Sequence, residues 1–128
     1  MILVDSNIWI NAGIGLFSLE AATRGQVVAV CPPIVQELLQ GTEDRRRYDL
    51  TRAVLAATRM LDASMPLERF EAAADIYLAC RAKGFTIRSA HDCLIAACAI
   101  AHDVPVMSDD SDFFYMARVT DLRVLTRS

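Results

Sequence analysis

Short apolar runs alternate with longer amphipathic segments along the chain, which predicts strands and helices in turn. The apolar runs are about four or five residues long and rich in β-branched side chains, as in buried strands. We expect strands at 1–4, 26–30, 61–65, 104–107 and 122–125. The segments between them carry helix-start and helix-stop residues, and we expect helices near 17–24, 32–40, 43–60, 67–83 and 89–102.

This order of elements indicates parallel βαβ units, so we expect one α/β domain that spans residues 1–128. Helices that connect parallel strands cover both faces of their sheet. The fold class is therefore a three-layer α/β/α sandwich with a mostly parallel sheet of about five strands. In such sheets, binding sites form beyond the carboxyl ends of the strands, where the strand order reverses.

Four acidic residues that are far apart in the sequence are expected to meet at that edge. Asp5 ends the first strand, and Asp110 follows the fourth. A connecting helix runs antiparallel to the strands, so its first turns also lie at the carboxyl edge. Glu37 stands in the second turn of helix 32–40, and Asp92 stands in the first turn of helix 89–102. Hard cations that prefer oxygen ligands, such as Mg²⁺ or Mn²⁺, would relieve the repulsion among these carboxylates.

Each acid also has a simpler explanation, which is helix capping for Asp5, Asp92, Asp110 and Asp112, and a solvated helix position for Glu37. These explanations account for each residue singly. They do not account for a convergence of several acids, or for the crowding of three aspartates in the segment 108–114, SDDSDFF. We therefore favour a metal site.

Composition narrows the class of protein. Hydrophobic residues make up 54% and charged residues 23%, and no apolar run approaches the roughly 20 residues that span a bilayer. We expect a cytoplasmic protein without a signal peptide or membrane association. Its four cysteines lack C-x-x-C spacing and are expected to be buried thiols, neither disulfides nor zinc ligands. His91 and His102 are interpreted as partly buried or surface residues.

The net charge of −3 argues only weakly against nucleic-acid binding. A bound divalent cation can supply positive charge at the place where a phosphate must lie. The basic residues are nearly all arginine, which suits bidentate phosphate contacts, and Lys83 is the only lysine.

Three segments, ILVDSNIWI, PPIVQELLQG and IRSAHDCLIAACAIAHDVPVMSDDSDF, resemble PIN-domain proteins, specifically VapC-type ribonuclease toxins of type II toxin–antitoxin systems. The resemblance covers essentially the whole chain and implies the strand order 3-2-1-4-5. Ser108 stands where threonine is usual in the family and keeps the hydroxyl. The metal-binding acids that the resemblance implies are Asp5, Glu37, Asp92 and Asp110, with Asp112 as an auxiliary acid.

The resemblance implies a Mg²⁺- or Mn²⁺-dependent endoribonuclease that inhibits translation by cleaving RNA. It also implies a cognate antitoxin partner and a homodimer. Ser6, Asn7 and Ser108 would orient carboxylates or water. Arg88 would contact phosphate, or it is an ordinary surface arginine.

Two other functions stay open at this point. A carboxylate-based phosphatase or phosphoryl acceptor fits less well, because the segment after Asp5 lacks a D-x-D nucleophile pattern and Lys83 is badly placed for phosphate. A non-catalytic RNA- or protein-binding module would use the same acids only as helix caps. Metal-dependent RNA cleavage would exclude the second alternative.

Overall fold

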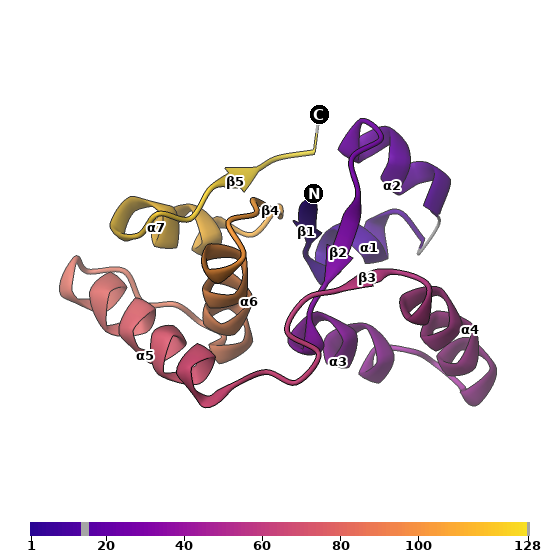
Figure 1. Ribbon diagram of the computed structural model, residues 1–128, viewed down its shortest axis with the longest axis horizontal. Coiled ribbons are helices and arrows are strands. Elements are labelled where there is room, and N and C mark those ends of the chain that lie inside the picture. Colours follow the sequence, from indigo (N-terminus) through magenta and orange to yellow (C-terminus); the bar gives the residue numbers. More distant parts are fainter. Residues whose placement is uncertain (14–15, 128) are drawn as a thin grey trace.

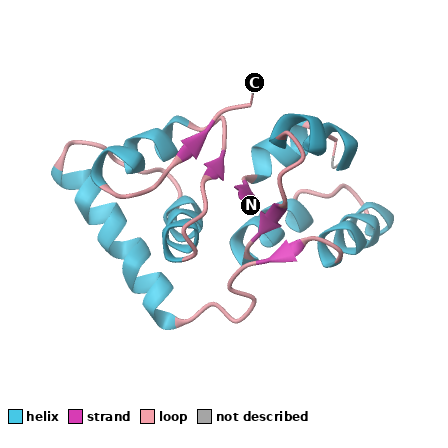
Figure 2. Ribbon diagram, turned by 45° about the horizontal axis from the view of Figure 1, so that its top comes forward, coloured by secondary structure: helices cyan, strands magenta, loops and turns pink. Residues whose placement is uncertain are grey.

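The computed structural model describes residues 1–13 and 16–127, in which helices surround one sheet (Figure 1, Figure 2). The strands are β1 (Ile2–Val4), β2 (Val28–Val30), β3 (Arg59–Met60), β4 (Val106–Met107) and β5 (Val124–Leu125). The helices are α1 (Ser6–Asn11), α2 (Leu16–Thr23), α3 (Pro32–Gln40), α4 (Arg45–Ala56), α5 (Leu67–Ala82), α6 (Ala90–Ala101) and α7 (Ser111–Val119).

The sheet has the order β3-β2-β1-β4-β5, and every neighbouring pair of strands is parallel. Leu3 at the centre of β1 pairs with Ala29 of β2 and with Val106 of β4. Helices α3 and α4 lie beside β2 and β3, and α5 to α7 lie beside β4 and β5 (Figure 1). The expected strand order and the parallel sheet are confirmed.

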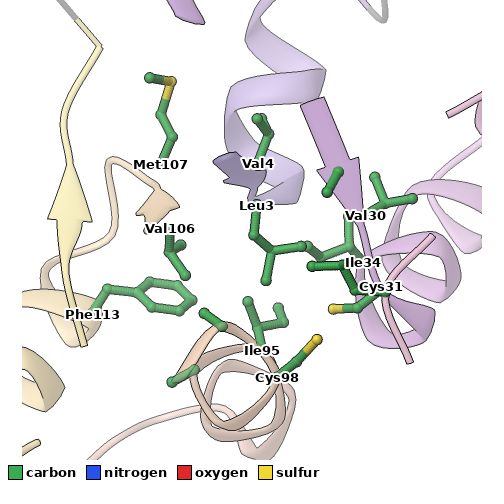
Figure 3. Close-up of a cluster of buried hydrophobic side chains, with 14 of the residues drawn as sticks. Leu3, Val4, Val30, Cys31, Ile34, Ile95, Cys98, Val106, Met107 and Phe113 are labelled. Carbon is green, nitrogen blue, oxygen red and sulfur yellow. The ribbon is translucent and has the colours of Figure 1, made fainter. Parts of the chain in front are cut away.

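Helices pack on both faces of the sheet, as the alternation of its side chains shows. Leu3 and Val106 point toward Ile95 of α6, whereas Val4 and Met107 point to the opposite side (Figure 3). On that side, Ala22 of α2 and Met107 line the same depression. All four strand residues are buried, so both faces of these central strands are covered. The three-layer α/β/α architecture is confirmed.

A single residue, Asp5, separates the end of β1 from the start of helix α1. The Asp5 carboxylate accepts a hydrogen bond from the backbone N–H of Ser6 and caps the helix. Trp9, one turn later, is fully buried, and its indole N–H donates to the carbonyl of Val4 at 3.1 Å. The next residue, Ile10, is 60% exposed because it lies on the outer side of this short helix.

Two expected element boundaries are wrong, and both corrections concern β3. Helix α4 ends at Ala56 instead of residue 60, because Arg59 and Met60 pair with Ala29 and Val30 in the sheet. The strand expected at 61–65 is therefore β3 at 59–60. Asp62 ends this run, since its φ of 53° lies in the left-handed region and turns the chain out of the sheet.

Two expectations from composition can be compared with the described residues. Cys31, Cys80, Cys93 and Cys98 are free and buried, as expected. Within 1–13 and 16–127, no helix combines the length and apolar character that a membrane crossing requires.

We predict that Trp9→Ala lowers the free energy of unfolding by about 3–5 kcal/mol, because it removes a large buried side chain. The neighbouring substitution Ile10→Ala is the matched control and should change stability by less than about 0.5 kcal/mol, since this side chain is mostly exposed. Urea denaturation of both variants measures the difference. Equal losses would contradict the placement of Trp9 as a core residue.

Candidate functional site

Five acidic side chains gather where β1 and β4 end and where α3, α6 and α7 begin. We call Asp5, Glu37, Asp92, Asp110 and Asp112 the carboxylate rim. Two groups within it, Asp5–Glu37–Asp92 and Asp92–Asp110–Asp112, each offer one oxygen per residue with all three oxygens within 4.8 Å of one another. Asp92 belongs to both groups and lies between the others. The structure thus brings together all the acids that the sequence singled out.

Asp5 is held at the rim by two hydrogen bonds. The backbone N–H of Ser6 donates to Oδ1 at 2.8 Å, and the hydroxyl of Ser108 donates to Oδ2 at 2.8 Å. Only 3% of the residue is exposed, and this burial raises the pKa of Asp5 to about 6 although both bonds favour the carboxylate. The capping explanation is correct for Asp5, and the same side chain also belongs to the rim.

Ser108 connects three parts of the site through one fully buried hydroxyl. Its Oγ donates to Asp5, and it accepts from the side-chain amide of Asn7 at 3.3 Å and from the backbone N–H of Asp110 at 3.0 Å. It therefore fixes the end of β4 against the start of α1. Sequence analysis expected Ser108 and Asn7 to orient carboxylates, and their contacts are consistent with that role.

Glu37 reaches the rim from the second turn of α3. Its Oε2 accepts from the Ser6 hydroxyl at 3.0 Å, whereas its buried Oε1 has no hydrogen-bond partner among the described residues. The imidazole Nδ1 of His91 lies 3.8 Å from Oε1. A buried carboxylate oxygen without a donor is costly, so this atom is suited to accept a ligand such as a cation.

Asp92 lies in the first turn of α6 and is 7% exposed. Its pKa is raised to about 7, first by burial and then by the charges of Asp5, Asp110, Glu37 and Asp112. The capping-box explanation is not supported, because within the described part of the chain the Ser89 side chain forms no capping hydrogen bond. Asp92 therefore meets the repulsion of the rim directly.

Arg88 lies at one side of the rim and contacts Asp112 and Asp110. Its backbone N–H and its Nε both donate to Asp112 Oδ2, at 3.1 and 3.4 Å, and its Nη2 donates to Asp110 Oδ1 at 3.3 Å. Asp112 raises the pKa of Arg88 through this hydrogen bond and through its charge. The sequence indicated a phosphate contact or a surface position for Arg88. No spacing pattern in the sequence indicated its pairing with the acids.

The three crowded aspartates of the SDDSDFF segment have different surroundings. Asp109 points away from the rim and pairs with Arg127 at 3.2 Å. Asp110 caps α7 through the backbone N–H of Asp112 and also joins the rim. Asp112 is buried against Arg88. The chain tolerates the crowding because Arg127 pairs with Asp109, and Arg88 pairs with both Asp110 and Asp112.

This arrangement of acids at the end of a parallel sheet can be compared with known families. Residues 2–119 match the family model described as PIN domain, which is most of the chain. The chain belongs to the PIN-domain family. Its acids therefore occupy the rim of a PIN domain, in the strand order that the resemblance implied.

Relatives of this PIN-domain chain carry names that state an activity. "VapC ribonuclease Mb1587" of Mycobacterium bovis and "Ribonuclease VapC11" of Mycobacterium tuberculosis are each 34% identical to it, with 96% of both chains covered. A solved structure of VapBC2 from Rickettsia felis, bound to a DNA fragment from the promoter, matches with a TM-score of 0.77 at 18% identity over the full length of both chains. VapBC-1 from nontypeable Haemophilus influenzae matches with a TM-score of 0.71 at 18% identity and 98% coverage of both. At these identities the two structures show a shared fold.

We predict that Asp92→Asn stabilises the chelator-treated protein and that its advantage over wild type grows from pH 5 to pH 7.5. The raised pKa of Asp92 means that the folded state holds a proton that the unfolded chain releases near pH 4. The stability of the wild type therefore falls as the pH rises toward about 7, while Asn cannot lose this proton. The difference in free energy of unfolding between the variant and the wild type should grow by on the order of 1–3 kcal/mol, as measured by chemical denaturation.

Asp112→Asn is the matched control, because it removes a charge of the same rim that already has a cationic partner. It should destabilise the protein, since Arg88 loses its charged partner and its two hydrogen bonds to residue 112 are no longer to a carboxylate. Loss of stability in both variants at every pH would show that repulsion at Asp92 is negligible.

Proposed function

We propose that residues 1–128 form a single PIN nuclease domain that cleaves RNA endonucleolytically with a divalent metal ion, and that this activity makes it the toxin of a toxin–antitoxin pair. The observation that carries the proposal is the overlap of two three-carboxylate groups at Asp92, beside a buried Glu37 oxygen without a hydrogen-bond donor. The 34% identity to relatives named ribonucleases supports the choice of RNA as the substrate.

The donor set of the rim fits Mg²⁺ or Mn²⁺. Its candidate ligands are all carboxylate oxygens, contributed by Asp5, Glu37, Asp92 and Asp110, with Asp112 as an auxiliary acid. When bound there, such an ion would lower the pKa of a water molecule and stabilise charge on the attacking and leaving oxygens of a phosphodiester. Because water would be the nucleophile, we expect products with a 5′-phosphate and a 3′-hydroxyl.

The remaining residues of the site would keep these acids in position. The Ser6 hydroxyl donates to Glu37, and its backbone N–H donates to Asp5, so one residue ties two elements together. Asn7 donates to the hydroxyl of Ser108, which in turn donates to Asp5. These bonds reduce the freedom of the carboxylates in the metal-free protein, so less conformational entropy is lost when a ligand binds.

Arg88 is the residue we propose to contact the substrate phosphate. Its side chain is 74% exposed beside Asp110, so it can reach a phosphate placed over the rim. The planar guanidinium forms two parallel hydrogen bonds with phosphate more readily than an ammonium group does. Asp112 would keep this arginine at the rim while substrate binds.

The antitoxin is proposed from the relatives, and the homodimer from the family resemblance alone. Solved structures of similar fold are titled as VapBC complexes, and one is titled as a toxin–antitoxin complex from Klebsiella pneumoniae. On this chain, the exposed side chains of Ile10 and Leu50 line a depression together with Leu38, which suits an apolar partner segment. We propose that the protein acts in the cytoplasm, where it would inhibit translation.

We predict that the purified protein cleaves a mixed RNA pool with Mn²⁺ or Mg²⁺ and that chelator stops the reaction. Asp5→Asn should abolish cleavage while the fold is kept, because one ligand charge is lost and the volume barely changes. Gel analysis of the RNA and end-labelling of the products measure both outcomes.

Asp49→Asn is the control for this experiment, since Asp49 is an exposed acid of α4 outside the rim. It should cleave like the wild type. Full activity of correctly folded Asp5→Asn would remove Asp5 from the site, and RNA binding without cleavage by the wild type would favour a non-catalytic module.

We predict that expression of the protein alone arrests bacterial growth by inhibiting translation, and that co-expression of its cognate antitoxin restores growth. Growth curves and incorporation of labelled amino acids measure the two effects. Asp5→Asn, expressed to the same level, should be harmless. Normal growth with abundant soluble wild-type protein would argue against the toxin assignment.

A further inference from the structure

A second group of metal-ligand side chains lies along α6, apart from the carboxylate rim. Asp62, Cys98 and His102 each offer one ligand atom, and the three atoms lie within 4.8 Å of one another. Cys98 and His102 are four positions apart, so they share one side of the helix end. His102 follows Asp92 by ten residues, about 15 Å along a helix axis. The group therefore belongs to a different place from the proposed nuclease site.

Asp62 is already oriented within this group. Its Oδ2 accepts from Nε of Arg69 at 2.8 Å, and its Oδ1 lies 2.8 Å from Nε2 of His102. A ligand oxygen of Asp62 also lies within 4.8 Å of the Cys98 sulfur. The Asp62 side chain is 7% exposed and the His102 side chain 34%, so the site is closed inside and open to solvent at the imidazole. This opening provides a path of entry for an ion.

Cys31 stands next to this group as a further sulfur donor. It is the residue before α3, and it is fully buried. The sulfur atoms of Cys31 and Cys98 point toward each other (Figure 3). Cys31 lies outside the set of three atoms that are within 4.8 Å of one another, so its thiol would have to move toward the ion to join them.

We propose that Asp62, Cys98 and His102 bind a zinc ion and that Cys31 supplies the fourth ligand. This mixture of sulfur, nitrogen and oxygen donors is typical of zinc and unlike the all-oxygen rim. Tetrahedral coordination with zinc–ligand distances of about 2.0–2.3 Å places ligand atoms about 3.3–3.8 Å apart. On binding, the distance between the Asp62 oxygen and the His102 nitrogen would lengthen slightly. Ligand atoms that are farther apart, up to 4.8 Å, would move closer together.

The charges of the site balance when zinc is bound. Asp62 and two thiolates carry three negative charges, and zinc together with Arg69 carries three positive ones. Arg69 would stay on Oδ2 of Asp62 and fix the carboxylate as an outer partner. The neighbouring Cys31 thiol, followed by burial, raises the pKa of the Cys98 thiol. Zinc binding would therefore release protons and become tighter as the pH rises.

The consequence for the fold is a cross-link between helix α6 and the ends of the paired strands β2 and β3. The ion would join the segment after β3 to α6 and to the first residue before α3. Helices α6 and α3 carry Asp92 and Glu37 at the rim. The site would stabilise the scaffold whether or not the chain is a nuclease.

Cobalt(II) is a suitable probe, because a thiolate bound to cobalt gives a near-ultraviolet charge-transfer band that carboxylate ligands do not give. We expect the chelator-treated full-length protein to develop this band with one equivalent of cobalt and to lose it when zinc is added. Asp92→Asn and His91→Gln are the matched controls, since they change the rim and the other histidine, and both should keep the band.

Cys98→Ala should abolish the band, Cys31→Ala should weaken it, and His102→Gln should lower zinc affinity at least about tenfold. His102→Gln is the decisive variant if a cysteine substitution impairs folding, because this side chain is partly exposed. In the Asp92→Asn background, zinc should raise the melting temperature only when Cys98 is intact. The proposal is overturned if the wild type shows no thiolate band, if the band persists in Cys98→Ala, or if His102→Gln binds zinc like the wild type.

Discussion

Burial of several carboxylates at one edge of the sheet is the constraint on which the rest of this structure depends. Asp5 and Asp92 are almost inaccessible to solvent, and burial is the main cause of the raised pKa of each. The favourable packing of helices on the sheet, with Trp9 and Ile95 fully buried, must offset this cost. Hydrogen bonds from Ser6 and Ser108 reduce it further. The site is therefore unfavourable by itself and is maintained by the core beneath it.

The rim divides into two halves with different electrostatic surroundings. Around Asp112, Arg88 supplies a permanent positive charge, so this half is balanced within the chain. Around Asp5, Glu37 and Asp92, the described residues place only His91 nearby, at 3.8 Å from Glu37. A divalent cation would be stabilised most strongly by the unbalanced half. The balanced half places Arg88 next to it. We therefore propose that metal and phosphate bind at adjacent parts of one surface.

The family resemblance implied the strand order, and chain direction predicted the convergence of the acids. In a parallel sheet, every residue just after a strand and every first turn of a connecting helix lies at the same edge, so Asp5, Asp92 and Asp110 could be placed without coordinates. The boundaries of β3 could not, since Arg59 and Met60 form a strand only through pairing with β2. The Arg88–Asp112 pair and the contacts of Asp62 with Cys98 and His102 depend on how segments distant in sequence pack, and no local spacing encodes them.

The strands are only two or three residues long, and their two ends carry different kinds of residue. All the rim acids stand at one end, while the other end carries connections such as the turn at Arg24 and Gly25 and the bend near Asp121. Both Arg24 and Gly25 adopt left-handed φ values there, as tight surface turns require. An insertion into such a turn would lengthen a connection without displacing any carboxylate of the rim. One end of the sheet can therefore accept inserted segments, while the rim acids at the opposite end keep their positions.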